Sequence, residues 1–180
     1  MAYKNPDINS SYRQNDLGRT LYNTVLTMNP DVIIEFGTLH GYSAVCMAQA
    51  LRDLDSDAMV YCYDIWEIYP YNKASKSQTQ KTINNLGLTN YICLLENDFY
   101  NWKFEQFDLL HFDISNHGSK LKDLQKIIRK DNSFSGTVLF EGGSKERDKV
   151  EWMKDYDAIN KSNINYITIN EDFPSLSLML

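Results

Sequence analysis

Short apolar runs alternate with longer polar or amphipathic stretches along this chain. Seven of these runs, each bounded by turn-forming residues, are typical of buried β-strands. They cover residues 32–36, 58–63, 91–95, 107–112, 137–140, 165–169 and 175–180. The stretches between them predict helices over residues 16–28, 43–51, 75–86, 121–129 and 147–156. In the first helix, Leu17, Leu21 and Val25 fall on one face, and Asp16 is the expected N-cap.

The order of these elements indicates an α/β fold. Strands and helices alternate through residue 156, which is typical of a parallel sheet with helices on both faces. Only residues 170–174 separate the last two strands. A parallel crossover needs about a dozen residues or more, so this short link predicts an antiparallel hairpin. We therefore expect a Rossmann-like, doubly wound sheet of seven strands whose last strand is antiparallel.

The length and the cysteine pattern favour a single domain in a reducing compartment. We expect one domain over residues 1–180, with 1–13 as a polar N-terminal arm. Neither a signal-peptide pattern nor an apolar run of about 18 residues is seen. Cys46, Cys62 and Cys93 are odd in number and contain no CxxC pair, so we interpret them as reduced core residues. These observations favour a cytoplasmic location.

The charge balance argues against polyanionic partners. The formal net charge is −6, which disfavours nucleic acid and anionic membranes as partners. The chain does contain a local basic cluster at helical spacing, which we interpret as a solvated helix face. Its members are Lys120, Lys122, Lys126, Arg129 and Lys130.

The segment PDVIIEFGTLHGYS, residues 30–43, predicts a small-molecule site. A buried strand leads into a turn with Gly37 and Gly41 and then into a helix N-terminus, an arrangement that lets a ligand approach the backbone. Glu35 interrupts the apolar strand, and a carboxylate is rarely buried without a partner. A dinucleotide GxGxxG motif would need glycine at the positions of Leu39 and Tyr42, so phosphate anchoring is poorly supported.

Further acidic residues follow the next three strands. Asp64 ends the second strand, Asp98 follows the third and Asp113 ends the fourth. Because the carboxyl ends of neighbouring strands converge on one crevice in a doubly wound sheet, these carboxylates are expected to line the same pocket. The sequence shows no basic anchor for this pocket. A carboxylate-lined pocket favours a cationic nucleoside over a nucleotide.

Four motifs together carry a family resemblance. EFGTLHGYS, YDIWE, ENDF and FDLLHFD, in this order and spacing, resemble the class I S-adenosylmethionine (SAM)-dependent methyltransferases. The small-molecule O-methyltransferases are most similar, since their first motif also reads acidic-x-G-x-x-x-G-Y-S. The segment FDLLHFDISNH further resembles the branch that methylates sugar hydroxyls. The resemblance extends over residues 14–180 and implies the same fold, including the reversed final strand.

The resemblance also implies roles for individual residues in binding SAM. The methionine part of SAM is expected at the first turn, the ribose hydroxyls at Asp64, and the adenine near Ile65 or Trp66 and at Asp98 and Phe99. Asp113 is expected nearest the sulfonium and the acceptor. At the first turn, the implied residues are Glu35, Gly37, Thr38, Gly41 and Ser43.

A hydroxyl acceptor must lose a proton, either to a side chain or with help from a metal ion. His117 is the leading candidate for the general base, with Asp113 as its catalytic neighbour, whereas His111 in mid-strand is interpreted as a core residue. In the families that the chain resembles, a divalent cation is held by an Asp ending strand four and by an Asp-Asp or Asp-Asn pair ending strand five. Here Asp113 and Glu141 are the candidate ligands for Mg²⁺, and Gly142 stands where the third ligand would be.

Other functions remain open from the sequence. The changed metal ligands are also compatible with a non-catalytic binding or interaction protein that has kept the SAM fold. A nicotinamide-dependent oxidoreductase is disfavoured by the first turn. The expected function is methyl transfer from SAM to a hydroxyl of a small molecule, and the sequence does not distinguish a sugar from a catechol-like acceptor. The pattern is compatible with a homo-oligomer.

Overall fold

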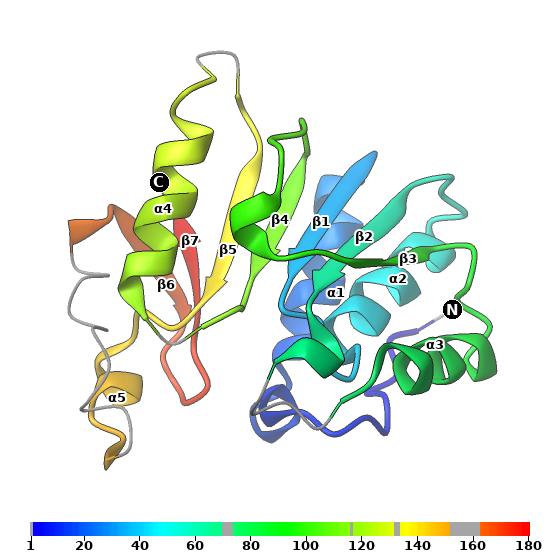
Figure 1. Cartoon of the computed structure of the whole chain (residues 1–180). Helices are drawn as coiled ribbons and strands as arrows, with labels where there is room; N and C mark the ends of the chain where they lie inside the picture. The colour runs from blue at the N-terminus through cyan, green and yellow to red at the C-terminus, as the bar shows by residue number, and fades with distance from the viewer. Residues whose placement is uncertain (1, 70–73, 116, 132–133, 152–162) are drawn as a thin grey trace.

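The computed structural model describes residues 2–69, 74–115, 117–131, 134–151 and 163–180, and it contains one seven-stranded sheet (Figure 1). The strand order is β3-β2-β1-β4-β5-β7-β6. The strands are β1 (Val32–Phe36), β2 (Met59–Asp64), β3 (Ile92–Glu96), β4 (Leu109–Phe112), β5 (Thr137–Glu141), β6 (Tyr166–Asn170) and β7 (Leu176–Met179).

The sheet topology confirms the predicted fold. Strands β1 to β5 pair in parallel, and β7 pairs antiparallel with both β5 and β6. The strand order runs outward from β1 through β2 to β3 on one side and from β4 to β5 on the other. In open α/β sheets, ligands bind in the crevice outside the carboxyl ends of the strands at such a reversal.

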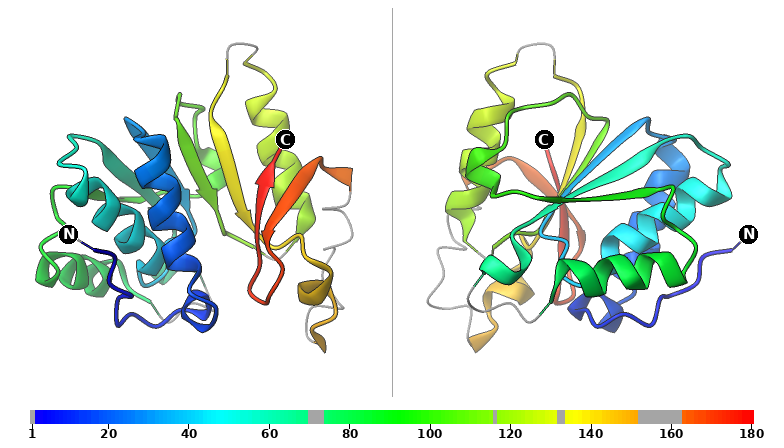
Figure 2. Two further views of the ribbon diagram at one scale, coloured as in Figure 1. Left: turned by 180° about the vertical axis from the view of Figure 1, so that it is seen from behind. Right: turned by 45° about the vertical axis from the view of Figure 1, so that its right-hand side comes forward.

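Helices cover both faces of the sheet (Figure 2). The helices are α1 (Leu17–Met28), α2 (Tyr42–Asp53), α3 (Lys76–Asn85), α4 (Gly118–Ile128) and α5 (Lys145–Asp148), with short 3-10 helices η1 (Ser11–Gln14), η2 (Trp66–Ile68) and η3 (Phe99–Asn101). Apolar side chains of α1 and α2 join one core cluster on the sheet, and those of α4 join the cluster on the opposite face. The two clusters divide the alternating side chains of β1, because Ile33 belongs to the first and Ile34 to the second.

Most predicted boundaries lie within two residues of the observed ones, and the exceptions are at helix ends. Helix α4 begins at Gly118 rather than at 121. Helix α5 spans Lys145–Asp148, and the predicted continuation beyond residue 151 lies outside the described residues. Asp16 does not cap α1 with its side chain, because its carboxylate instead accepts hydrogen bonds from Tyr3 and Arg19.

The N-terminal segment contributes to the core, although its sequence predicts an irregular polar arm. Ile8 and Tyr12 are both buried in the cluster under α1 and α2. Cys46 and Cys62 are buried, Cys93 is partly exposed, and all three are free, as predicted. In the described parts of the chain, no helix has both the length and the apolar character to cross a membrane.

Candidate functional site

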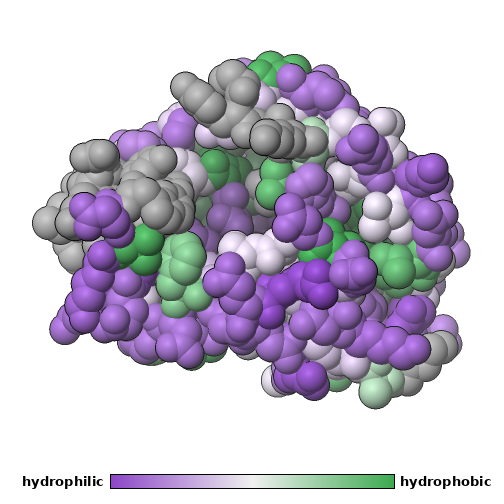
Figure 3. All heavy atoms as spheres, turned by 90° about the horizontal axis from the view of Figure 1, so that it is seen from below, coloured by the Kyte–Doolittle hydropathy of each residue, from purple (hydrophilic) through white to green (hydrophobic). Residues whose placement is uncertain are grey.

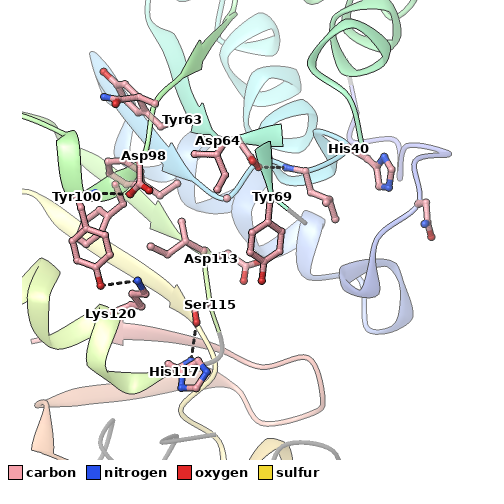
Figure 4. A pocket seen from close by; sticks show the side chains of 18 residues that line it. His40, Tyr63, Asp64, Tyr69, Asp98, Tyr100, Asp113, Ser115, His117 and Lys120 are labelled. Atoms are coloured by element: carbon pink, nitrogen blue, oxygen red, sulfur yellow. Dashed lines mark hydrogen bonds between the residues drawn. The ribbon is translucent and has the colours of Figure 1, made fainter. Parts of the chain in front are cut away.

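A cavity of about 720 Å³ opens at the carboxyl ends of the parallel strands. Figure 3 views this end of the molecule, where both hydrophilic and hydrophobic side chains border the hollow. The cavity is lined by Asn9, by residues 36, 37, 39 and 40 at and after the end of β1, by 63–65 and 69 at and after the end of β2, by 97–100 after β3, and by 113–115, 117 and 120 after β4. Its size is typical of a small-molecule or cofactor site. All four segments predicted to converge do meet there (Figure 4).

The turn after β1 requires glycine at its first position. Gly37 has a φ of +87°, and a Cβ at this position would collide with the carbonyl oxygen of Asp113. Its amide donates to the Tyr63 carbonyl at 3.0 Å, so the turn is tied to β2 as well as to β4. Gly41, with a φ of +86°, lies just before α2 and does not line the cavity. The two glycines therefore shape the turn, and only Gly37 faces the ligand space.

Asp64 holds the same turn from the end of β2. Its Oδ2 accepts a hydrogen bond from the Leu39 amide at 2.7 Å, and its Oδ1 accepts one from the Trp66 amide at 2.8 Å. A carboxylate offers about four acceptor positions, so each oxygen can still accept a second hydrogen bond. Because Asp64 also lines the cavity, its remaining acceptor capacity is available to a ligand hydroxyl.

Asp98 and Phe99 line the cavity from the segment after β3. The Asp98 carboxylate accepts a hydrogen bond from the Tyr100 amide at 2.9 Å and so caps η3. The Phe99 ring packs edge-on against Phe36 and Phe112. Ile65, which follows Asp64, also lines the cavity. These residues can enclose a flat ring whose polar edge faces Asp98.

Asp113 is the most perturbed carboxyl group at the cavity. Burial, followed by the charge of Glu141, raises the pKa of Asp113 to about 7. The charge of His111 and a hydrogen bond from Tyr12 act in the opposite direction and lower this pKa. Asp113 can therefore change its protonation state near neutral pH.

Several residues with predicted cofactor roles do not line the cavity. Glu35 is fully buried, and its Oε1 lies 3.0 Å from His111 Nδ1. His111 thus provides both the partner expected for a buried carboxylate and the core role predicted for this histidine. Trp66 is also fully buried, and its Nε1 donates to the Leu39 carbonyl at 3.1 Å, so of the two residues predicted to flank adenine only Ile65 reaches the cavity. Thr38 and Ser43 are likewise buried away from the cavity.

Both predicted catalytic residues lie at the cavity. His117 and Asp113 line it together, and the His117 amide donates to the Ser115 hydroxyl at 3.1 Å (Figure 4). His40, on the turn after β1, lines the cavity on the side away from His117.

The residues at the end of β5 do not fit the predicted metal site. Both oxygens of the buried Glu141 carboxylate accept hydrogen bonds from the buried Arg147, at 2.8 Å from Nε and 2.7 Å from Nη2. Both carboxylate oxygens that would have to bind Mg²⁺ are thus already engaged in a bidentate ion pair. Among the described residues, no group of three or more His, Cys, Asp and Glu side chains could hold a metal ion. Glu141 is therefore an ion-pair partner, and Asp113 is left without a second carboxylate ligand.

One basic side chain lines the cavity, although its helical spacing in the sequence predicts a solvated helix face. Lys120 lines the cavity, its Nζ donates to the Tyr100 hydroxyl at 2.6 Å, and it lies 3.9 Å from the centre of the Tyr100 ring. The expectation of a pocket without a basic group was therefore wrong. Helical spacing alone did not show that the first turn of α4 faces the cavity, because α4 begins three residues earlier than predicted.

Comparisons with known proteins agree with this geometry. The profile of a family described as a methyltransferase domain matches residues 34–141, which include the turn after β1 and the ends of β2, β4 and β5. No curated protein matches the chain at a significant level.

Many solved structures share the fold. A Podospora anserina methyltransferase, PaMTH1, bound to S-adenosylhomocysteine (SAH), has a TM-score of 0.68 at 16% identity, covering 91% of this chain and 76% of its own. An O-methyltransferase from Bacillus cereus in complex with SAH has a TM-score of 0.66 at 14% identity, with 98% and 84% covered. TomG, an O-methyltransferase of tomaymycin synthesis from Streptomyces achromogenes, in complex with SAM, has a TM-score of 0.64 at 15% identity, with 97% and 82% covered.

Proposed function

The chain belongs to the methyltransferase-domain family, and we propose that it transfers a methyl group from SAM to a hydroxyl group of a small molecule. The carrying observation is Asp64, which ends β2, lines the cavity and is held by two backbone amides. A fixed acceptor at this place suits the ribose hydroxyls of a nucleoside. The structural neighbours that bind SAM or SAH support the choice of nucleoside.

The cavity suggests one orientation for SAM. With the ribose on Asp64, the adenine would lie between Ile65 and Phe99, with its amino group toward Asp98. The methionine part would follow Gly37 toward His40, which offers a partner for the carboxylate. In this orientation the sulfonium lies nearest Asp113, whose carboxylate is drawn electrostatically to a positive charge.

The reaction needs little beyond positioning and removal of one proton. The acceptor oxygen attacks the methyl carbon in line, the carbon–sulfur bond breaks, and its electron pair stays on sulfur to give neutral SAH. The hydroxyl proton passes to His117, which lines the acceptor end of the cavity beside Ser115 (Figure 4). Glu141 is bound to Arg147, so the proposed reaction does not use it as a ligand for Mg²⁺.

The three free cysteines accord with a reducing compartment, so we place this reaction in the cytoplasm.

Turnover of SAM tests the reaction and distinguishes the enzyme from a non-catalytic binding protein. Purified protein is incubated with SAM and a panel of catechols, phenols and sugars, and SAH is quantified by mass spectrometry. We expect acceptor-dependent SAH formation, with kcat reduced roughly 100-fold in His117→Ala because general-base catalysis contributes about that much. Binding of SAM without transfer to any member of the panel would favour the non-catalytic function.

A further inference from the structure

The proposed reaction leaves one charged side chain of the cavity without a role. Lys120 lies in the first turn of α4, and it is the only lysine or arginine among the described residues that line the cavity. The acidic side chains that line the same cavity are Asp64, Asp98 and Asp113. The Lys120 ammonium is therefore the one fixed positive charge there that could attract a negatively charged part of the acceptor.

Tyr100 holds the Lys120 ammonium in place. Lys120 Nζ donates to the Tyr100 hydroxyl at 2.6 Å and lies 3.9 Å from the centre of the Tyr100 ring. The Tyr100 backbone is fixed in turn, because its amide donates to the Asp98 carboxylate at 2.9 Å. A lysine ammonium has three N–H donors, so two remain for a ligand after the hydrogen bond with Tyr100.

Pairing along the helix, the usual role of a surface lysine, does not explain Lys120. Its ammonium forms no ion pair with a carboxylate in the described part of the chain. Asp123 lies three residues from both Lys120 and Lys126, a spacing that brings side chains together on a helix. Lys126 is the lysine that pairs with Asp123, at 2.8 Å. Lys120 instead extends to Tyr100 at the cavity.

Lys120 lies at the end of the cavity where the proposed reaction places the acceptor. Its amide donates to the His117 carbonyl at 3.3 Å, so the two residues are one helical turn apart. Figure 4 shows Lys120 on the same side of the cavity as His117 and away from His40, which marks the methionine end of SAM in the proposed orientation. An acceptor whose hydroxyl faces His117 therefore has its other groups within reach of Lys120.

We propose that Lys120 binds a carboxylate of the methyl acceptor, so that the acceptor is a small hydroxylated acid. The proposal rests on the proposed function, because it specifies the acceptor of that same reaction. A carboxylate has two oxygens for the two remaining N–H donors of Lys120 and a single charge to match the single ammonium. A phosphate group carries nearly two negative charges, and the aspartates of the cavity would repel the second. Tyr100 is a positioning residue that keeps the ammonium at the acceptor end.

Calorimetry on the SAH-loaded protein tests this role of Lys120 with acceptor-like probes. The probes are two matched pairs, a dihydroxybenzoate with its amide and glucuronate with its amide, and the members of a pair differ mainly in charge. We expect the acid of at least one pair to bind about tenfold more tightly than its amide. In Lys120→Met, the two members should bind within about twofold of each other, and the Kd of SAH should not change. The pair that shows the preference distinguishes an aromatic from a sugar-like acceptor.

Lys130→Met is the matched control, because Lys130 is an exposed lysine just after α4 that does not line the cavity. It removes the same charge and should keep the preference for the acid. Lys120→Arg retains the positive charge and should keep most of the preference. Tyr100→Phe keeps the ring but removes the hydroxyl that holds Nζ, so it should lower the preference about threefold.

A preference for neither acid in the unmodified protein, or a preference that persists in Lys120→Met, would overturn the proposal. Weaker SAH binding by Lys120→Met would place this lysine against the cofactor and would overturn the proposal as well. Failure of the unmodified protein to bind SAH, or to form SAH from SAM with an acid that binds, would overturn the proposed function instead.

Discussion

Ionisable side chains crowd together where β4 and β5 end. The charge of Glu141 acts on Asp113 there, and the buried His111 is within hydrogen-bond distance of both Glu35 and Tyr12, at 3.0 and 3.1 Å. A carboxyl group in such surroundings is stabilised in its protonated form, as its pKa of about 7 reflects. Each residue therefore acts through its neighbours, and substitutions here are expected to show effects that depend on pH.

Asp113→Asn should alter how stability depends on pH. The pKa of Asp113 is raised from 3.8 to about 7 in the folded protein. The stability that this carboxyl contributes is therefore present at acidic pH and is lost as the pH rises through 7. Asparagine does not ionise, so the Tm of Asp113→Asn relative to that of the unmodified protein should rise between about pH 4 and pH 7 and level off above pH 7. Thermal unfolding across this range measures the difference, and a constant difference would contradict the assigned pKa.

Arg147→Met should destabilise the fold strongly. It leaves the buried Glu141 carboxylate without the two hydrogen bonds that it accepts from Arg147. Breaking a buried ion pair in this way costs about 3–5 kcal/mol. Chemical denaturation measures the loss, and the double variant Arg147→Met/Glu141→Leu should recover most of it because no uncompensated charge remains. If the double variant is as unstable as Arg147→Met, the loss does not come from breaking the Arg147–Glu141 ion pair.

The turn between β1 and α2 is the element that shapes the site. Three elements fix it, through the Asp64 carboxylate of β2, the Trp66 indole of η2 and the Thr79 hydroxyl of α3, with the last two donating to the Leu39 carbonyl. The turn is thus prearranged before any ligand binds. Prearrangement reduces the entropy that binding must overcome.

Gly37→Ala should destabilise this turn more than a matched substitution elsewhere. The alanine methyl group would collide with the Asp113 carbonyl. The alanine backbone would also have to keep a φ of +87°, which is strained for a residue with a side chain. Gly87→Ala is the control, since Gly87 has a φ of +66° and open space around it. We expect Gly87→Ala to cost about 1 kcal/mol from backbone strain alone and Gly37→Ala at least twice as much. Equal losses of stability in chemical denaturation would show that the collision with the Asp113 carbonyl does not destabilise the protein.

Elements were easier to predict from the sequence than their contacts. Apolar runs located all seven strands, and the five-residue link before β7 was enough to predict the reversed hairpin. The ends of β2 and β4 gave Asp64 and Asp113 as cavity residues, because parallel strands end at a common edge. The partnership of Glu35 with His111 depends on the register of two strands whose sequence positions differ by 76, and that of Tyr12 with His111 joins positions that differ by 99. No local pattern carries such information.

At the scale of the whole molecule, the doubly wound sheet gathers the ends of β1 to β4 around one cavity. Acidic side chains from β2, from the segment after β3 and from β4 face it, and the chain as a whole carries a net charge of −6. This distribution favours a cationic ligand such as SAM over a phosphorylated nucleotide. Because both oxygens of Glu141 are bound by Arg147, Glu141 does not provide the Mg²⁺ ligand predicted from the sequence, and the described residues contain no other group of three or more metal-ligating side chains.

Calorimetric titration with SAH tests the central claim, a SAM-binding cavity centred on Asp64, most directly. We expect SAH to bind the unmodified protein, and Asp64→Ala to weaken binding roughly 10- to 100-fold through loss of charge-assisted hydrogen bonds to the ribose. Asp57→Ala, just before the opposite end of β2, should leave the Kd unchanged once circular dichroism has shown that both variants fold. No binding at near-millimolar SAH, or equal affinity for Asp64→Ala and Asp57→Ala, would contradict this account.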